Sequence, residues 1–183
     1  MPYAKSDYIE TDTGNRISRK CIIQGSTNIV LAGKTIMEAG VILRGDLRRA
    51  GSGPAVVLAL GKYCRIGQGC VIRPSYKTYK GVFSYYPMKI SDFVTIGENT
   101  VVEAASIGNM VQIGKNCVIG RFTIIKDCAV ILDNTVLAPG TVVPSMTVFG
   151  GSPGKLIEDL PESYPEIVEK AARDYYADFK PAT

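Results

Sequence analysis

The sequence contains no histidine at all. Histidine is the commonest general base near neutral pH and the commonest metal ligand in proteins. Its absence removes most of the familiar catalytic mechanisms and metal sites. Carboxylates, lysine, tyrosine and cysteine can also act in catalysis, so composition alone does not exclude an enzyme.

Long apolar runs are also missing. Of the 183 residues 46% are hydrophobic, yet no stretch approaches the roughly 18 apolar residues that a membrane-spanning helix needs. The first ten residues, MPYAKSDYIE, have no apolar signal-peptide segment. The sequence therefore predicts a protein of the cytosol or nucleus with no direct membrane insertion.

The cysteines show neither a disulfide pattern nor a zinc-binding pattern. Their number is odd and no two of them have CxxC spacing. We therefore expect small, reduced and buried thiols. The five residues are Cys21, Cys64, Cys70, Cys117 and Cys128.

A period of six residues runs through most of the chain. From Ile90 the hexads read ISDFVT, IGENTV, VEAAS, IGNMVQ, IGKNCV, IGRFTI, IKDCAV, ILDNTV, LAPGTV, VPSMTV and FGGSPG. Each begins with an apolar residue, its fifth position is small or β-branched, and VEAAS is one residue short. Similar hexads begin at Val30, Ile36 and Ile42, and again at Leu60 and Ile66. Six is the period of neither a helix nor a strand, so the repeat indicates a solenoid.

The hexads predict a three-sided coil. Each would supply one short strand and one corner, and stacked coils would pair in parallel about 4.8 Å apart. First-position side chains such as Ile113, Ile119 and Ile125 would point inward, with small fifth-position residues near the corners. The corners need positive φ, which glycine and asparagine adopt most easily. These corner residues would be Gly97, Gly108, Gly114, Gly120, Asn99, Asn116 and Asn134.

The expected fold class is therefore all-β, a left-handed parallel β-helix with a C-terminal α-helix. The handedness follows from the resemblance of the hexads to hexapeptide-repeat proteins. The β-helix would occupy residues 1–159, with loops inserted at about 48–56 and 73–89.

The C-terminal unit, residues 160–183, changes to helical spacing and predicts a helix from about 163 to 180, packed on the β-helix. Ser163 and Glu166 would form a capping box, with Pro165 in the first turn. The apolar face would consist of Ile167, Val168, Ala171, Ala172, Tyr175, Tyr176 and Phe179.

No catalytic residue, metal ligand or cofactor is predicted. The stretch VILRGD resembles γ-class carbonic anhydrases, in which the Arg and Asp meet at a subunit contact; here Arg44 and Asp46 are present, but every metal-binding histidine is missing. The pairs Cys64 with Cys70 and Asp127 with Asp133 do not converge on a ligand, and Glu103 has no assigned role. No glycine-rich phosphate loop opens a helix.

The second inserted segment combines aromatic and basic residues. Tyrosine and arginine often supply the binding energy of protein interfaces, which favours a protein-contact loop. Packing against the β-helix and binding of nucleic acid are alternatives. The net charge of +4 is spread along the chain, so a nucleic-acid partner is not favoured. With Arg44 and Asp46, the candidate contact residues are Arg73, Tyr76, Lys77, Tyr79, Lys80, Phe83, Tyr85 and Tyr86.

Nearly the whole chain resembles the dynactin subunit 5 family. The resemblance rests on SDYIETDTGNRISRK, NIVLAGKTI, VIRPSYK, IGKNCVIGR and ILDNTVLAPGTVVPSMTVFGGSPG. The sequence departs from it at RRAGSGPAV and at Ser91, which stands in a usual glycine place.

The resemblance implies a cytoplasmic, cytoskeleton-associated, non-enzymatic subunit of the dynactin pointed-end complex. It implies adaptor docking that selects cargo, early endosomes in particular, for dynein-driven microtubule transport. The implied partners are dynactin subunit 6, dynactin subunit 4, the pointed-end actin-related protein and dynein cargo adaptors. The alternative is a divergent hexapeptide-repeat acyltransferase or a γ-carbonic-anhydrase-like enzyme.

Overall fold

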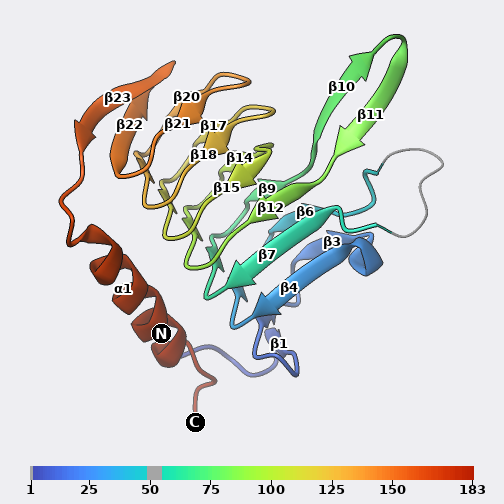
Figure 1. Ribbon diagram of the computed structural model, residues 1–183. Helices are drawn as coiled ribbons and strands as arrows, with labels where there is room; N and C mark the ends of the chain where they lie inside the picture. Colours follow the sequence, from blue (N-terminus) through green and yellow to red (C-terminus); the bar gives the residue numbers. More distant parts are fainter. Residues whose placement is uncertain (1, 49–54) are drawn as a thin grey trace.

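Three parallel sheets form the sides of a prism in the computed structural model, which describes residues 2–48 and 55–183 (Figure 1). Successive coils pair in parallel, as β13 does with β16 and β16 with β19. The predicted left-handed parallel β-helix with a C-terminal helix is confirmed. Within the described ranges, no helix is both long enough and apolar enough to cross a membrane.

The first sheet has nine strands among the described residues. Its end strands, β1 and β23, run antiparallel to their neighbours, and the others are parallel. In spatial order the strands are β1 (Tyr8–Glu10), β2 (Arg16–Ser18), β5 (Ile36–Met37), β8 (Arg65–Ile66), β13 (Thr95–Ile96), β16 (Gln112–Ile113), β19 (Val130–Ile131), β22 (Thr147–Gly151) and β23 (Gly154–Asp159).

The other two sheets have six parallel strands each within the described part of the chain. The second sheet contains β3 (Ile22–Gln24), β6 (Ile42–Arg44), β9 (Val71–Ile72), β14 (Val101–Val102), β17 (Val118–Ile119) and β20 (Val136–Leu137). The third contains β4 (Ile29–Gly33), β7 (Leu58–Lys62), β12 (Met88–Ile90), β15 (Ser106–Ile107), β18 (Ile124–Ile125) and β21 (Val142–Val143). A short 3-10 helix, η1 (Ser26–Asn28), joins β3 to β4.

The first-position side chains fill the axis of the prism, as the repeat predicts. Ile113, Ile119 and Ile125 are 3%, 0% and 1% exposed. Strand pairing places equivalent positions opposite one another, for example Ile96 opposite Ile113. Each coil therefore covers the apolar residues of the next, which is the main source of stability in such a stack.

The predicted hexad frame is wrong by one residue in the first coils. Val30, which was expected to point inward, is 48% exposed, whereas the neighbouring Leu31 packs against the core. In the same way, Met37 and Leu43 lie opposite the buried Ile66 and Ile72. These hexads carry two adjacent aliphatic residues, so the sequence allows two frames. Pairing with the next coil selects one, and a slip of one residue would turn every side chain to the other face.

The corner prediction is correct for the asparagines and wrong for the glycines. Asn99, Asn116 and Asn134 have φ values of 57°, 55° and 60°. In the full-length hexads from Ile90 to Val143 this fourth position is left-handed whatever residue occupies it, including Phe93, with φ 59°. Gly97, Gly108, Gly114 and Gly120 occupy the second position and do not have positive φ.

Close approach between coils explains the second-position glycines. A Cβ atom at Gly114 would lie 2.3 Å from Asp133 Oδ1 and 2.6 Å from the Asp133 backbone nitrogen. The glycine therefore removes a steric conflict with the next coil, while the fourth position provides the turn.

Fifth-position side chains make hydrogen bonds inside the prism. Thr123 Oγ1 donates to the Gly120 carbonyl at 2.7 Å, and Cys70 Sγ donates to the Gly97 carbonyl at 2.9 Å. Burial raises the pKa of Cys64 to about 12 and that of Cys70 to about 11. All five cysteines are free, and all are buried except the half-buried Cys21. Their role is packing, in agreement with the sequence.

Asp127 and Asp133 join neighbouring coils. Asp127 accepts a hydrogen bond from the backbone N–H of Asn109 at 2.7 Å, and Asp133 accepts one from that of Lys115 at 2.8 Å. Each carboxylate satisfies a corner donor of the preceding coil. These contacts give both residues a structural role.

The helix α1 (Tyr164–Asp178) runs along the outside of the first sheet (Figure 1). The Arg16 guanidinium lies 3.9 Å from the centroid of the Tyr176 ring and donates to the carbonyls of Tyr176 and Phe179. Arg65 stacks on Tyr175 in the same way, at 3.9 Å. A cation at the helix C-terminus also interacts favourably with the helix dipole.

Two details of the predicted helix are wrong. Ser163 is the N-cap residue but its side chain makes no capping hydrogen bond, so the predicted capping box with Glu166 does not form. Ile167, expected on the apolar face, is 59% exposed, whereas Val168 and Phe179 are buried. Pro165 does occupy the first turn.

Candidate partner-docking site

The second inserted segment is a β-hairpin. Its strands β10 (Ser75–Tyr79) and β11 (Val82–Tyr86) pair antiparallel and project from the corner between the second and third sheets (Figure 1). Lys80 and Gly81 form the two-residue turn with φ values of 48° and 75°. Two successive positive φ values match a type I′ turn, which suits the twist of a hairpin. The segment that the sequence identified only as a loop is thus an ordered ribbon.

The base of the hairpin is fixed to the prism. Ser75 Oγ donates to the Glu103 carbonyl at 2.5 Å and accepts from the Phe122 backbone N–H at 3.0 Å. The rings of Tyr86 and Phe122 meet edge to face, with centroids 5.4 Å apart. Arg73 forms an ion pair of 3.3 Å with Glu103. Arg73 and Tyr86 therefore anchor the ribbon, and Glu103 gains the structural role that the sequence did not assign.

One face of the hairpin carries an aromatic cluster. The ring centroids of Tyr76, Phe83 and Tyr85 lie 5.1–6.2 Å apart. Arg121, from the prism, stacks on Tyr76 at 4.5 Å from the ring centroid. Phe83 is nevertheless 49% exposed, so the cluster leaves apolar surface available to a partner.

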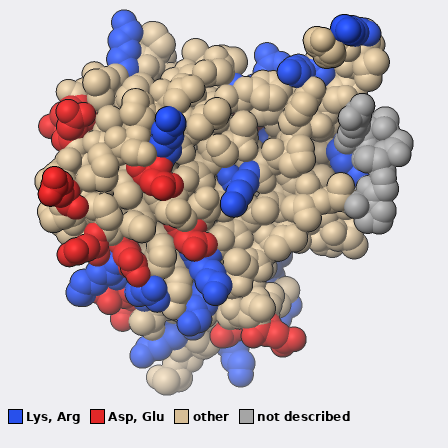
Figure 2. All heavy atoms as spheres, in the orientation of Figure 1, with Lys and Arg blue, Asp and Glu red and all other residues tan. Residues whose placement is uncertain are grey.

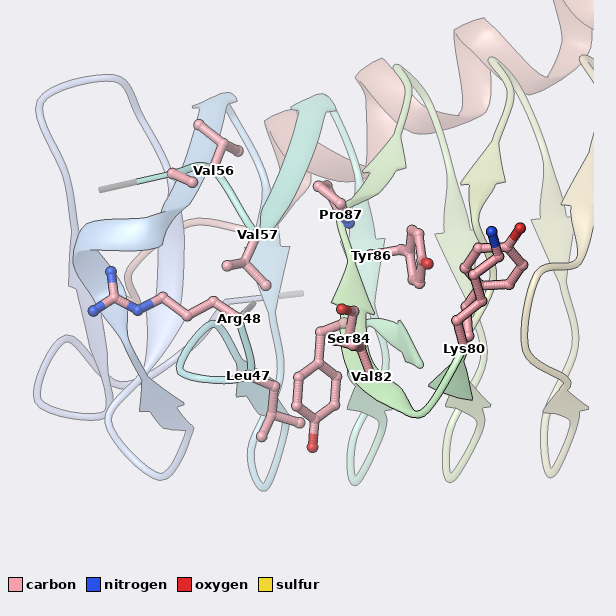
Figure 3. Close-up of a pocket in the computed structure, with 12 residues that line it drawn as sticks. Leu47, Arg48, Val56, Val57, Lys80, Val82, Ser84, Tyr86 and Pro87 are labelled. Atoms are coloured by element: carbon pink, nitrogen blue, oxygen red, sulfur yellow. The ribbon is translucent and has the colours of Figure 1, made fainter. Parts of the chain in front are cut away.

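A pocket of about 500 Å³ lies between the hairpin and the prism. In Figure 3, Arg48, Val56 and Val57 come from one side and Val82, Ser84 and Tyr86 from the other. Tyr79 and Val82 near the turn are 62% and 58% exposed. The described lining residues are Leu47, Arg48, Ala55, Val56, Val57, Tyr79, Lys80, Val82, Ser84, Tyr85, Tyr86 and Pro87.

The hairpin segment carries positive charge only. Residues 73–89 contain Arg73, Lys77, Lys80 and Lys89 but no aspartate or glutamate. Figure 2 shows basic side chains on the projecting hairpin, while the acidic side chains visible in this view gather on the opposite side and below. Since Arg73 pairs with Glu103, the positive charge of the hairpin comes mainly from its lysines, and together with the apolar surface it favours an acidic partner.

The predicted Arg44 and Asp46 lie near this site as a bidentate ion pair. Arg44 Nε and Nη2 donate to Asp46 Oδ1 and Oδ2 at 2.9 and 3.0 Å. This hydrogen bonding lowers the pKa of Asp46 and raises that of Arg44, with a smaller contribution to Arg44 from Tyr85. The two charges compensate each other and add little net charge to the surface.

The structure brings only part of the predicted set to the pocket. Tyr79, Lys80, Tyr85 and Tyr86 line it, whereas Tyr76 and Phe83 belong to the aromatic cluster. Lys77 lies over Tyr86, 5.1 Å from its ring centroid. Sequence analysis did not identify Leu47, Val56 or Val57 as site residues; Val56 ends the first inserted segment and the other two flank it. Of that segment, predicted at 48–56, residues 49–54 lie outside the described residues.

The described side chains of the pocket are mostly apolar or aromatic. No group of three or more cysteine, aspartate or glutamate residues in the described ranges could hold a metal ion. The pocket is lined by apolar residues, tyrosines, one serine and two cations. Such a surface fits the apolar side chains of a binding partner.

Comparisons with known sequences agree over the full length. The family pattern described as dynactin subunit 5 matches residues 1–183. A curated relative, dynactin subunit 5 from Dictyostelium discoideum, is 49% identical over 181 residues, which cover 99% of this chain and 87% of the relative.

Comparisons with solved structures show the fold. A hexapeptide transferase family protein from Anaplasma phagocytophilum is 18% identical, with 92% of each chain covered and a TM-score of 0.62. AntD, an N-acyltransferase from Bacillus cereus in complex with dTDP and 3-hydroxybutyryl-CoA, is 16% identical, with 93% of each chain covered and a TM-score of 0.57. At such low identity the similarity extends to the β-helix and not to activity.

Proposed function

The chain belongs to the dynactin subunit 5 family, and from this premise we propose that it is a non-enzymatic subunit of dynactin that docks partner proteins. Its place would be the pointed-end complex, beside dynactin subunit 6, dynactin subunit 4 and the pointed-end actin-related protein. There it would bind cargo adaptors, those of early endosomes in particular, for dynein-driven transport along microtubules. This role places it in the cytoplasm, associated with the cytoskeleton.

The observation that carries the proposal is the hairpin with its pocket. An apolar pocket of about 500 Å³ opens beside exposed Tyr79 and Val82 on a segment without acidic residues. We expect its occupant to be a protein segment with aliphatic or aromatic anchors next to acidic residues. The anchors would provide affinity, and the acidic groups would steer the encounter toward Lys80.

The test places a negative charge at the mouth of the pocket. In Val82→Glu, we expect the affinity-purified full chain to lose at least about tenfold in bound cargo adaptor, because a desolvated carboxylate would oppose the apolar anchor. The matched control is Ile167→Glu on α1, since the two residues are 58% and 59% exposed. The control should retain its adaptors, and both variants should melt like the parent.

Equal adaptor recovery from Val82→Glu and the parent would contradict docking at the hairpin. The non-enzymatic part is tested separately on the purified chain. Stoichiometric metal, or acyl transfer that depends on enzyme concentration, would overturn it. Tyr86→Ala is a poor probe, because Tyr86 packs on Phe122 and anchors the hairpin.

A further inference from the structure

The second sheet carries a continuous column of outward aliphatic side chains. Strand pairing places six such residues directly opposite their neighbours in adjacent coils. Every one is valine or isoleucine, and the outermost, Ile22, is 51% exposed. This aliphatic column consists of Ile22, Ile42, Val71, Val101, Val118 and Val136.

The equivalent outward positions of the other two sheets are different. On the first sheet they include Arg16, Arg65 and Gln112, and α1 lies over them. On the third sheet they include Lys89 and Ser106 between aliphatic residues. Among the described residues, only the second sheet presents an unbroken aliphatic row along the prism.

Packing within the fold does not explain the aliphatic column. The inward first positions are apolar, but outward positions accept polar residues, as Thr95 and Gln112 show on the first sheet. Isolated exposed aliphatic residues are ordinary, whereas a contiguous apolar row is typical of an interaction surface. Val118, on the next-to-last strand β17, is 42% exposed.

Charges beside the column are compensated. Arg44 pairs with Asp46, and Arg73 pairs with Glu103, on the side of the sheet nearer the hairpin. These two ion pairs add little net charge to the flank, where Arg121 stacks on Tyr76 of the hairpin. A complementary partner surface would also be nearly neutral, since an unpaired charge would be desolvated against valine and isoleucine.

We propose that the aliphatic column docks a flat, neutral β-sheet face of a partner protein. Six strands at about 4.8 Å spacing extend roughly 24 Å, and a second sheet offers side chains at the same repeat. A helix is a less suitable occupant. The helix α1 is held on the first sheet by stacking of Arg16 and Arg65 on its tyrosines, and the aliphatic column contains no cation for such a contact.

The sheet face could supply about half of a stable interface. With a width of about 16 Å for five extended residues, the sheet face offers roughly 400 Å² to a partner. A stable interface needs about 800 Å² per partner. The partner would therefore also contact surface beside the column, apart from the hairpin pocket. The inference rests on the proposed role as a subunit of an assembly.

The experiment uses two variants of nearly equal exposure. Val118→Glu changes the aliphatic column, and Ile124→Glu changes the third sheet; the parent residues are 42% and 40% exposed. The tagged full chain is purified from cells, and the other dynactin subunits bound to it are quantified. We expect Val118→Glu to lose at least about tenfold of one or more of these subunits, and Ile124→Glu to retain them.

A photocrosslinking residue in place of Val118 tests the chemistry of the occupant. We expect crosslinks to strands of another dynactin subunit. Crosslinks to a helix would overturn the inference. So would crosslinks between two copies of the chain, together with a concentration-dependent dimer that Val118→Glu dissociates.

The two docking proposals can fail independently. If Val118→Glu assembles like the parent while Val82→Glu loses adaptors, the aliphatic column is not an interface and the hairpin proposal stands. If Val118→Glu fails to assemble while Val82→Glu keeps its adaptors, the column is the docking surface and the hairpin proposal fails. Unchanged melting temperatures are required of both variants, so that a loss of binding reflects the surface.

Discussion

The fold explains which residues occupy the regular coils, whereas it does not explain those at the hairpin tip. Inside the coils, position determines what is allowed: Cys117 and Thr135 occupy the same fifth position, and both are buried. At the hairpin tip, Tyr79 is 62% exposed and lies beside an open pocket. Packing and hydrogen bonding inside the prism account for the choice of residue in the coils, but they do not account for an exposed tyrosine. Surface residues that the fold does not require are therefore where function should be sought.

The largest expected effect on stability is the difference between the inward and the outward residue of strand β18. Ile125 is 1% exposed and its neighbour Ile124 is 40% exposed. Ile125→Asp should lower the free energy of unfolding by at least about 3 kcal/mol, because it buries an unpaired charge. Ile124→Asp should cost less than about 1 kcal/mol. Urea denaturation measures both, and equal losses would contradict the assignment of inside and outside.

A smaller effect on stability distinguishes the second hexad position, where coils approach closely, from the fourth position, where the backbone turns. Gly114→Ala places a Cβ atom against Asp133 and should cost about 1–3 kcal/mol through forced movement of the next coil. Asn116→Gly, at a residue with φ 55°, should change stability by less than about 1 kcal/mol. Denaturation midpoints distinguish them, and a neutral Gly114→Ala would refute the close approach of the coils.

The pH dependence of stability should reveal the buried thiols. Burial raises the pKa of Cys64 to about 12, so the folded state keeps the proton that the unfolded state releases above pH 9. Stability should therefore be full below about pH 9 and decrease as the pH rises toward 12, by up to about 1.4 kcal/mol per pH unit for each such thiol.

Cys64→Ala is the control for this pH effect. It should cost stability at neutral pH but show a shallower decrease from pH 9 to 10.5, measured by denaturant unfolding. The same slope in parent and variant would mean that other groups dominate. Between pH 6 and 8 the free energy of unfolding should change little, because the chain has no histidine.

The smallest expected stability effect is at the hairpin tip. Tyr79→Ala removes a ring that is 62% exposed and should change the melting temperature by no more than about 2 °C. Adaptor binding should nevertheless decrease. A large loss of stability would mean that Tyr79 belongs to the fold, and the contrast between coil and hairpin would then fail at this residue.

Sequence reasoning worked best where a hexad offers a single choice. From Ile90 onward glycine often follows the inward aliphatic residue, as it does after Ile113 and Ile119, and the predicted inward set is correct. In the first coils no glycine follows the inward residue, and the period cannot decide between adjacent aliphatic residues such as Val30 and Leu31. The correct frame depends on pairing with Leu60 in the next coil, which is a long-range contact.

The candidate site could be predicted only in part. Composition identified the aromatic and basic hairpin residues, and Gly81 between two runs rich in aromatic residues was an available turn signal. The opposite wall of the pocket, including Val56 and Val57, comes from another segment of the chain. The aliphatic column was hidden because insertions of different length separate its members, so they align only after the coils are stacked.

The antiparallel strands at the two ends of the first sheet have a consequence for particle size. A stack of equal coils has no natural limit, and another coil could in principle dock on either end. β1 and β23 reverse the strand direction there, so a further parallel coil would find the wrong hydrogen-bonding pattern on that side. The rod is therefore expected to stay a discrete particle of fixed length and not to grow end to end into fibres.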